Sequence, residues 1–195
     1  MNTNSVENLI QEELLQLALD ASRNGNVHAA IAYFEKAISR EDTTAVAHYL
    51  LGAEYAQIQK YDAAVAQMGA AIALDPSLNI ARFQLGLLWI TQGNGANAQL
   101  ILAPLEEVPA DNPLHHFGKG LIYLTQDQFP ECVQHLKQGI ELNTENLPLN
   151  NDMQRILDEI AKMDAHSTAV ETQKEAEESD AQHIFLSAYT DKNGH

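Results

Sequence analysis

Hydrophobic residues recur along this chain at helical spacing, in segments that short polar breaks separate. Leu14, Leu17, Ala18 and Ala21 would share one face of a helix, and residues 31–38 show a similar face. Polar or glycine-containing breaks lie at 24–26, 59–61, 93–95 and 126–128. Such breaks suit the tight turn of a helix hairpin, and no run alternates as a strand would. The pattern therefore predicts an all-α protein made of helix hairpins.

The same residue types return at intervals of 34 positions. Small residues stand at Ala18, Gly52, Gly86 and Gly120. A second small series comprises Ala30, Ala64, Ala98 and Cys132, a third series Ala21, Tyr55, Trp89 and Tyr123, and a fourth Phe34, Met68, Leu102 and Leu136. Glycine inside a helix costs roughly 1 kcal/mol relative to alanine, so three glycines in register need an offsetting benefit. We expect that benefit to be close contact between the two helices of each unit, with the small series of the second helix facing the glycines.

These positions resemble the tetratricopeptide repeat (TPR). The second unit matches at Leu51, Gly52, Tyr55, Tyr61, Ala64, Ala71 and Pro76, the third at Leu85, Gly86, Trp89 and Ala98, and the fourth at Gly120, Tyr123 and Phe129. The first unit is degenerate, and the fourth departs at Lys119, Cys132 and Gly139. The resemblance covers about residues 11–146 and implies a right-handed α-solenoid of four TPR-like hairpins. The expected repeats span about 11–44, 45–78, 79–112 and 113–146.

Both ends of the chain differ from the repeats. Residues 1–10 are expected to lead into the first helix. Residues 147–164 carry an apolar stripe at Leu149, Met153, Ile156, Leu157 and Ile160, which predicts a C-terminal capping helix. Residues 165–195 are predicted to be an acidic linker followed by an apolar tail with Ile184, Phe185, Leu186 and Tyr189. The tail could fold back onto the repeats, serve as a recognition motif for a third protein, or be disordered.

In the family, the first helix of each pair lines a concave face that binds partners. The resemblance transfers this face to Leu15, Leu19, Tyr49, Ala53, Phe83, Leu87, Ile90, Phe117, Leu121 and Leu124. Tyr49, Phe83 and Phe117 are the expected anchors, because aromatic side chains often dominate binding energy at such surfaces. Part of the set could instead be packing residues. The cations with which some members clamp a C-terminal carboxylate are missing here, so that binding mode is disfavoured.

Composition narrows the choice of partner. The formal net charge is -16, which repels nucleic acid and anionic membrane surfaces. The first residues contain no basic region followed by an apolar run, and Cys132 is the only cysteine. We therefore expect a cytoplasmic protein without a disulfide framework. An apolar or amphipathic polypeptide, or a basic protein segment, is the expected partner.

No catalytic constellation is visible in the sequence. His115 and His116 are adjacent and would point to different faces of a helix, and His48 and His116 occupy a packing position. Cys132 belongs to a small-residue series and is expected to be a buried hydrophobe. We therefore expect no enzyme activity, no cofactor and no metal. The favoured function is a protein-binding adaptor or scaffold. The alternatives are a chaperone for a secreted or aggregation-prone client, similar to class II type III secretion chaperones, or a regulatory subunit of an enzyme complex.

Overall fold

The computed structural model describes residues 10–163 and residue 165 of the 195-residue chain. The chain forms two units, Met1–Thr144 and Glu145–His195. Within the described residues every regular element is a helix, which confirms the predicted all-α class. The predicted lead-in to the first helix and the predicted linker and tail lie outside the described residues, apart from residues 10 and 165.

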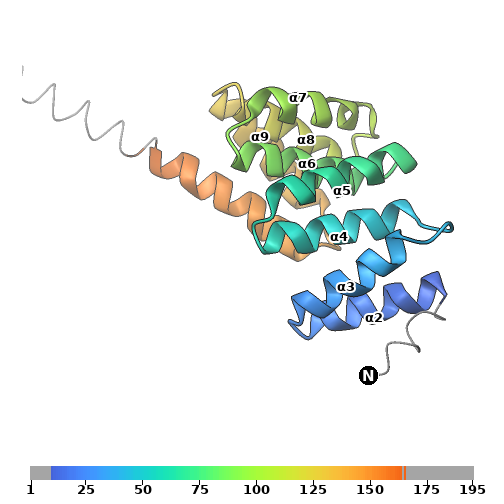
Figure 1. Cartoon of the computed structure of the whole chain (residues 1–195). Coiled ribbons are helices and arrows are strands. Elements are labelled where there is room, and N and C mark those ends of the chain that lie inside the picture. Colours follow the sequence, from blue (N-terminus) through green and yellow to red (C-terminus); the bar gives the residue numbers. More distant parts are fainter. Residues whose placement is uncertain (1–9, 164, 166–195) are drawn as a thin grey trace, which may run out of the picture. The chain divides into compact units, whose positions relative to one another are not determined.

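The described part of the first unit is a series of helix pairs (Figure 1). Its elements are α2 (Gln11–Arg23), α3 (Val27–Ile38), α4 (Ala45–Gln57), α5 (Tyr61–Leu74), α6 (Asn79–Thr91), α7 (Gly95–Leu102), the 3-10 helix η1 (Ala103–Glu107), α8 (Pro113–Leu124) and α9 (Phe129–Leu142). Each helix packs most extensively against its neighbour in a hairpin: α2 with α3, α4 with α5, α6 with α7, and α8 with α9. First helices begin at residues 11, 45, 79 and 113, and second helices at 27, 61, 95 and 129, so both series keep the 34-residue period.

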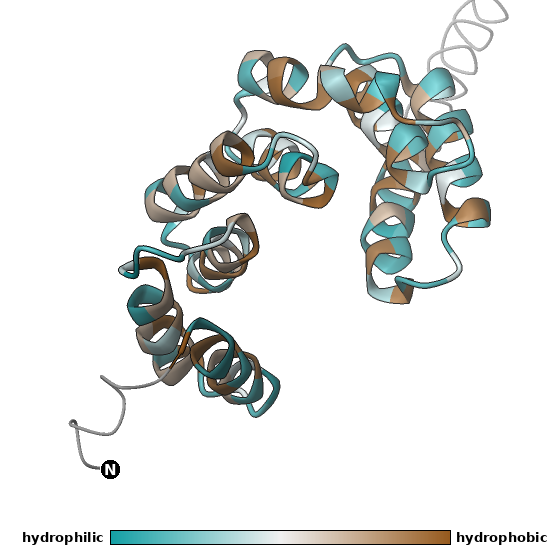
Figure 2. Cartoon of the chain, turned by 90° about the vertical axis from the view of Figure 1, so that its right-hand side faces the viewer, coloured by the Kyte–Doolittle hydropathy of each residue, from teal (hydrophilic) through white to brown (hydrophobic). Residues whose placement is uncertain are grey.

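The turn inside each hairpin has the same backbone conformation in all four pairs. The residues at 25, 59, 93 and 127 have positive φ, with values of 71°, 61°, 71° and 56°. Glycine fills the first and third of these positions and adopts such a φ without a Cβ clash, whereas Gln59 and Asp127 do not have that freedom. The turns predicted from the polar breaks are therefore confirmed. Several of the segments between helices are drawn as hydrophilic, whereas hydrophobic stretches recur along the helices (Figure 2).

The helical glycines admit large side chains from the second helix of the same pair. A Cβ added at Gly52 would lie 2.8 Å from Met68 Cγ, and one added at Gly120 would lie 2.6 Å from Leu136 Cδ2. The expected close contact is therefore present. The main partner of each glycine is the large residue of the second helix rather than the small one. At Gly52, the alanine of the small series, Ala64, contributes its carbonyl oxygen at 3.2 Å.

The third pair departs from the others in its second helix. α7 ends at Leu102, and the chain continues as η1, which contains Pro104 near its start. Proline lacks an N–H and its ring clashes with the preceding helical turn, so an α-helix does not continue through this position. Leu105 of η1 is fully buried and lies against α8, where a Cβ added at Gly118 would be 2.9 Å from Leu105 Cβ. Pro104 was the signal in the sequence for this break.

The described part of the second unit contains a helix over residues 147–163. Leu149, Met153, Leu157 and Ile160 are buried, in agreement with the predicted apolar stripe. Leu147 and Met163, at the two ends of this helix, are exposed. The role of this helix as a cap remains a prediction.

Candidate functional site

The candidate binding surface is the first-helix face, which we define as the side of the first unit formed by α2, α4, α6 and α8. Seven of the ten residues expected there are partly accessible: Leu15, Leu19, Tyr49, Ala53, Leu87, Ile90 and Leu124. The other three, Phe83, Phe117 and Leu121, have no exposed surface. Seven of the ten expected residues therefore keep some accessible surface, and three do not.

Phe83 and Phe117 are packing residues, so their expected role as anchors for a partner is wrong. Their ring centroids lie 6.0 Å apart with the planes tilted by 47°, which joins α6 directly to α8. Gly139 of α9 makes room for the second ring, because a Cβ added there would lie 2.5 Å from Phe117 Cδ1. Of the three expected anchors, Tyr49 alone stays partly accessible, and partial burial raises the pKa of its phenol.

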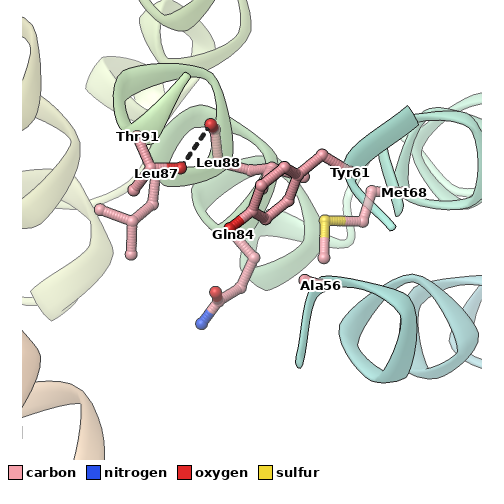
Figure 3. A pocket seen from close by; sticks show the side chains of 7 residues that line it. All are labelled: Ala56, Tyr61, Met68, Gln84, Leu87, Leu88 and Thr91. Atoms are coloured by element: carbon pink, nitrogen blue, oxygen red, sulfur yellow. Dashed lines mark hydrogen bonds between the residues drawn. The ribbon is translucent and has the colours of Figure 1, made fainter. Parts of the chain in front are cut away.

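A pocket of about 250 Å³ opens between the second and third helix pairs (Figure 3). It is lined by Ala56 from α4, by Tyr61 and Met68 from α5, and by Gln84, Leu87, Leu88 and Thr91 from α6. The Thr91 hydroxyl donates a hydrogen bond to the Leu88 carbonyl at 2.8 Å and is thereby occupied. The Gln84 amide points away from the helix that carries it. The pocket is mainly apolar, with one amide that can hydrogen-bond to a ligand.

Among the ten expected site residues, Leu87 is the one that lines this pocket. Tyr61 matches the repeat pattern, but Tyr61, Met68 and Gln84 are not among the ten expected site residues. The pocket forms where three helices converge. The expected site residues were transferred from the family for the first helix of each pair only. That transfer does not indicate which residues of α5 line the pocket.

A polar pair occupies the corresponding position between the first and second helix pairs. Ser22 Oγ of α2 donates a hydrogen bond of 2.5 Å to Glu54 Oε1 of α4. Glu54 is 4% exposed, and its second oxygen, Oε2, is buried without a hydrogen-bond partner among the described residues. Adding 34 to these two residue numbers gives Ala56 and Leu88, which both line the pocket. Neither Ser22 nor Glu54 is among the ten residues expected on this face from the sequence.

A cluster of histidines lies in the fourth helix pair. His116 Nδ1 is 3.2 Å from His135 Nδ1, and His116 Nε2 is 2.9 Å from the carbonyl oxygen of Ala110, to which it can donate. The His135 ring stacks on Tyr123 at a centroid distance of 5.5 Å. His116 is buried, as expected for a packing position. In the part of the chain that the structure describes, no group of three or more metal-ligating side chains is placed to hold an ion.

Acidification below about pH 6.5 is expected to destabilise the fourth helix pair. Burial lowers the pKa of both His116 and His135, and the nearby Lys119 lowers both further. The hydrogen bond to the Ala110 carbonyl opposes the effect at His116, and Glu106 opposes it at His135. The folded chain then binds fewer protons than the unfolded chain, so stability is present above the ordinary histidine pKa and is lost as pH falls. Urea unfolding at pH 7.5 and pH 5.5 measures this loss.

His135→Gln is the matched control for this effect. Its pair with His116 would reproduce the second repeat, where His48 Nδ1 lies 2.8 Å from Gln67 Oε1. The variant should lose less stability than the native chain between the two pH values. Equal losses in both proteins would contradict a role for His135.

Comparison with known proteins supports the same architecture. The tetratricopeptide repeat family model matches residues 15–59 and 49–112, which together span half of the chain. A search of curated proteins finds no match. In the described residues, no helix has both the length and the apolar character that crossing a membrane requires.

Several solved structures share the fold. One crystal structure of MamA is 26% identical, with 68% of this chain and 77% of that chain covered and a TM-score of 0.58. MamA from Desulfovibrio magneticus RS-1 is 17% identical, with 82% and 92% covered and a TM-score of 0.58. YrrB, a TPR protein with an unusual peptide-binding site, is 18% identical, with 70% and 71% covered and a TM-score of 0.56. The family match and the paired helices lead to one conclusion: this chain belongs to the tetratricopeptide repeat family.

Proposed function

We propose that this protein is an adaptor whose first-helix face binds an apolar or amphipathic polypeptide segment. The family fold supports a general role in protein–protein interaction. The observation that carries the finer proposal is the mainly apolar pocket between α4, α5 and α6, which the partly accessible Leu87 helps to line. An apolar surface of this kind suits a segment that buries one or two hydrophobic side chains.

The size of the pocket supports a side chain rather than a small-molecule ligand. Its volume of about 250 Å³ lies below the range of roughly 300–1,000 Å³ that is usual for small-molecule sites. Tyr61, Met68 and Leu88 supply apolar contacts for a large aliphatic or aromatic side chain. The Gln84 amide can donate to and accept from the backbone of the bound segment. We therefore place the energetic centre of binding at this pocket.

Selection from a library of random 12-residue peptides tests the proposal. The probes would be the full chain, the variant Leu87→Asp, and the control Leu100→Asp, whose wild-type side chain is 76% exposed on α7. The native chain and the control should enrich peptides with a large apolar residue. We expect Leu87→Asp to bind those peptides at least about 10-fold more weakly. The aspartate replaces an apolar contact by a charge, which should remove more than about 1.4 kcal/mol of binding free energy.

Two further observations make the outcome clear. Circular dichroism must show that both variants keep the helical content of the native chain. If folded Leu87→Asp binds the selected peptides as tightly as Leu100→Asp does, the pocket is not the binding site and the proposal fails.

A further inference from the structure

Glu54 is a carboxylate in a place where the fold does not require one. Its exposed fraction is 4%, and its Oε2 atom has no hydrogen-bond partner among the described residues. Burying a polar oxygen without a partner opposes folding, and the opposition is stronger when the group is charged. Such a group in a native structure calls for an explanation, and contact with a bound partner would provide one.

The repeat provides an internal comparison for this position. The residues 34 and 68 positions after Glu54 are Leu88 and Ile122, and those after Ser22 are Ala56 and Ile90. In the later repeats, the two positions that correspond to Ser22 and Glu54 are both apolar. One of these residues, Leu88, is buried. A leucine at residue 54 would suit packing equally well. The carboxylate is therefore better explained by recognition than by stability.

The surroundings of Glu54 are suited to a cation from outside the chain. No described lysine or arginine forms an ion pair with it. The Arg23 guanidinium on α2 lies 3.4 Å from Asp20, and the Lys60 ammonium lies 5.8 Å from the centroid of the Tyr55 ring. The formal charge of -16 favours the approach of a basic segment over long range.

We propose that Glu54 receives a lysine or arginine side chain of the polypeptide segment that binds on the first-helix face. This inference rests on the proposed function and adds a charged determinant to it. The Ser22 hydroxyl donates one hydrogen bond to Oε1. Because Oε2 is buried, an incoming cation has to displace neighbouring side chains to reach it. The resulting charge-assisted hydrogen bonds are stronger than the hydroxyl contact and give Oε2 the partner it lacks.

The two recognition points set a spacing in the bound segment. Glu54 contacts α2 and Ala56 lines the pocket toward α6, so the two points lie on opposite sides of α4. A helix with its side chains is about 10 Å wide, and an extended segment advances about 3.3 Å per residue. An extended partner would thus carry its basic residue about three positions from the apolar residue that enters the pocket.

The experiment is a selection of random 12-residue peptides on the full chain and on the variants Glu54→Leu and Glu54→Gln. The native chain should enrich peptides with a lysine or arginine about three positions from a large apolar residue. Both variants should keep the apolar preference and lose the basic one. Glu54→Leu copies the third repeat, so thermal unfolding should show it to be at least as stable as the native chain.

Affinities of one selected peptide complete the test. We expect Glu54→Leu to weaken its binding by about 10-fold or more. The same peptide with its basic residue changed to alanine should bind the native chain and Glu54→Leu equally, as expected when the two groups interact directly. If a variant fails to fold, the alanine peptide on the native chain still measures the contribution of the basic residue.

Two results would overturn the inference in different ways. Peptides that show the apolar preference without a basic one, and that depend on Leu87, would refute the role of Glu54 while leaving the proposed function intact. The absence of any enriched peptide on the native chain would refute both. An equal affinity of the native chain for the basic and alanine peptides would also refute the role of Glu54.

Discussion

Phe117→Ala is expected to lower the free energy of unfolding by about 3–5 kcal/mol, the range for truncation of a buried phenylalanine. The Phe117 ring has no exposed surface, packs 6.0 Å from Phe83 and occupies the space left by Gly139. Alanine would leave a cavity shared by α6, α8 and α9, which neighbouring side chains cannot fill without moving. Urea unfolding monitored by circular dichroism measures the loss.

Leu100→Ala is the matched control for this variant. Its side chain is 76% exposed on α7, so truncation should change stability by less than about 0.5 kcal/mol. A loss below about 1 kcal/mol for Phe117→Ala would mean that the ring is not a core residue. That result would restore the aromatic residues of the first helices as candidate anchors for a partner.

The Cys132 thiol is expected to react with iodoacetamide at pH 8 about 100-fold more slowly than an ordinary cysteine. Burial leaves Cys132 without exposed surface and raises the pKa of its thiol to about 11. Since the thiolate is the reactive form, a rise of about two units above the ordinary pKa reduces the reactive fraction about 100-fold at this pH. Burial slows the reagent further, because α9 must first open.

Alkylation followed by mass spectrometry, in buffer and in denaturing urea, measures this difference. The thiol should react rapidly in urea and slowly in the native protein. Equal rates would contradict the burial of Cys132. Slow reaction would agree with its position in the small-residue series of the second helices.

The period of the sequence was sufficient to predict the helix pairs. The first helices begin at 11, 45, 79 and 113 because the positions that pack inside a pair recur every 34 residues. The sequence predicted close contact at the helical glycines, but it did not predict that the large series, such as Leu136 at Gly120, would be the main partner. The break after α7 was signalled by Pro104, but the 34-residue period alone does not predict it, because Leu102 still occupies its periodic position.

The binding surface was harder to predict because burial depends on neighbouring pairs. Phe83 and Phe117 follow Leu15 and Tyr49 at intervals of 34 residues, yet only the two phenylalanines are fully buried. The difference arises from the direct contact between α6 and α8 and from Gly139 beneath Phe117, where the preceding repeats place Leu105 and Ala71. The resemblance to the family assigns each residue its position along the helix. It does not predict how the neighbouring side chains differ between repeats, and these decide whether the residue is buried.

Some polar contacts between helices recur with the repeat and some do not, so the period predicts only the former. His48 with Gln67 and His116 with His135 have the same separation of 19 residues, so the second contact could have been inferred from the first once the period was known. Glu54 with Ser22 has no polar counterpart in the later repeats. It therefore emerged only when the structure placed the two side chains in contact.

Hydrogen exchange of the full chain, with and without a selected 12-residue peptide, tests the central claim most directly. If the peptide binds at the pocket, exchange should slow mainly in α6, which contributes four of the seven lining residues, and in the adjoining parts of α4 and α5, and much less in α3 and α9. Leu87→Asp should abolish the protection in α6. Protection confined to the second helices, or unchanged in Leu87→Asp, would contradict binding at the first-helix face.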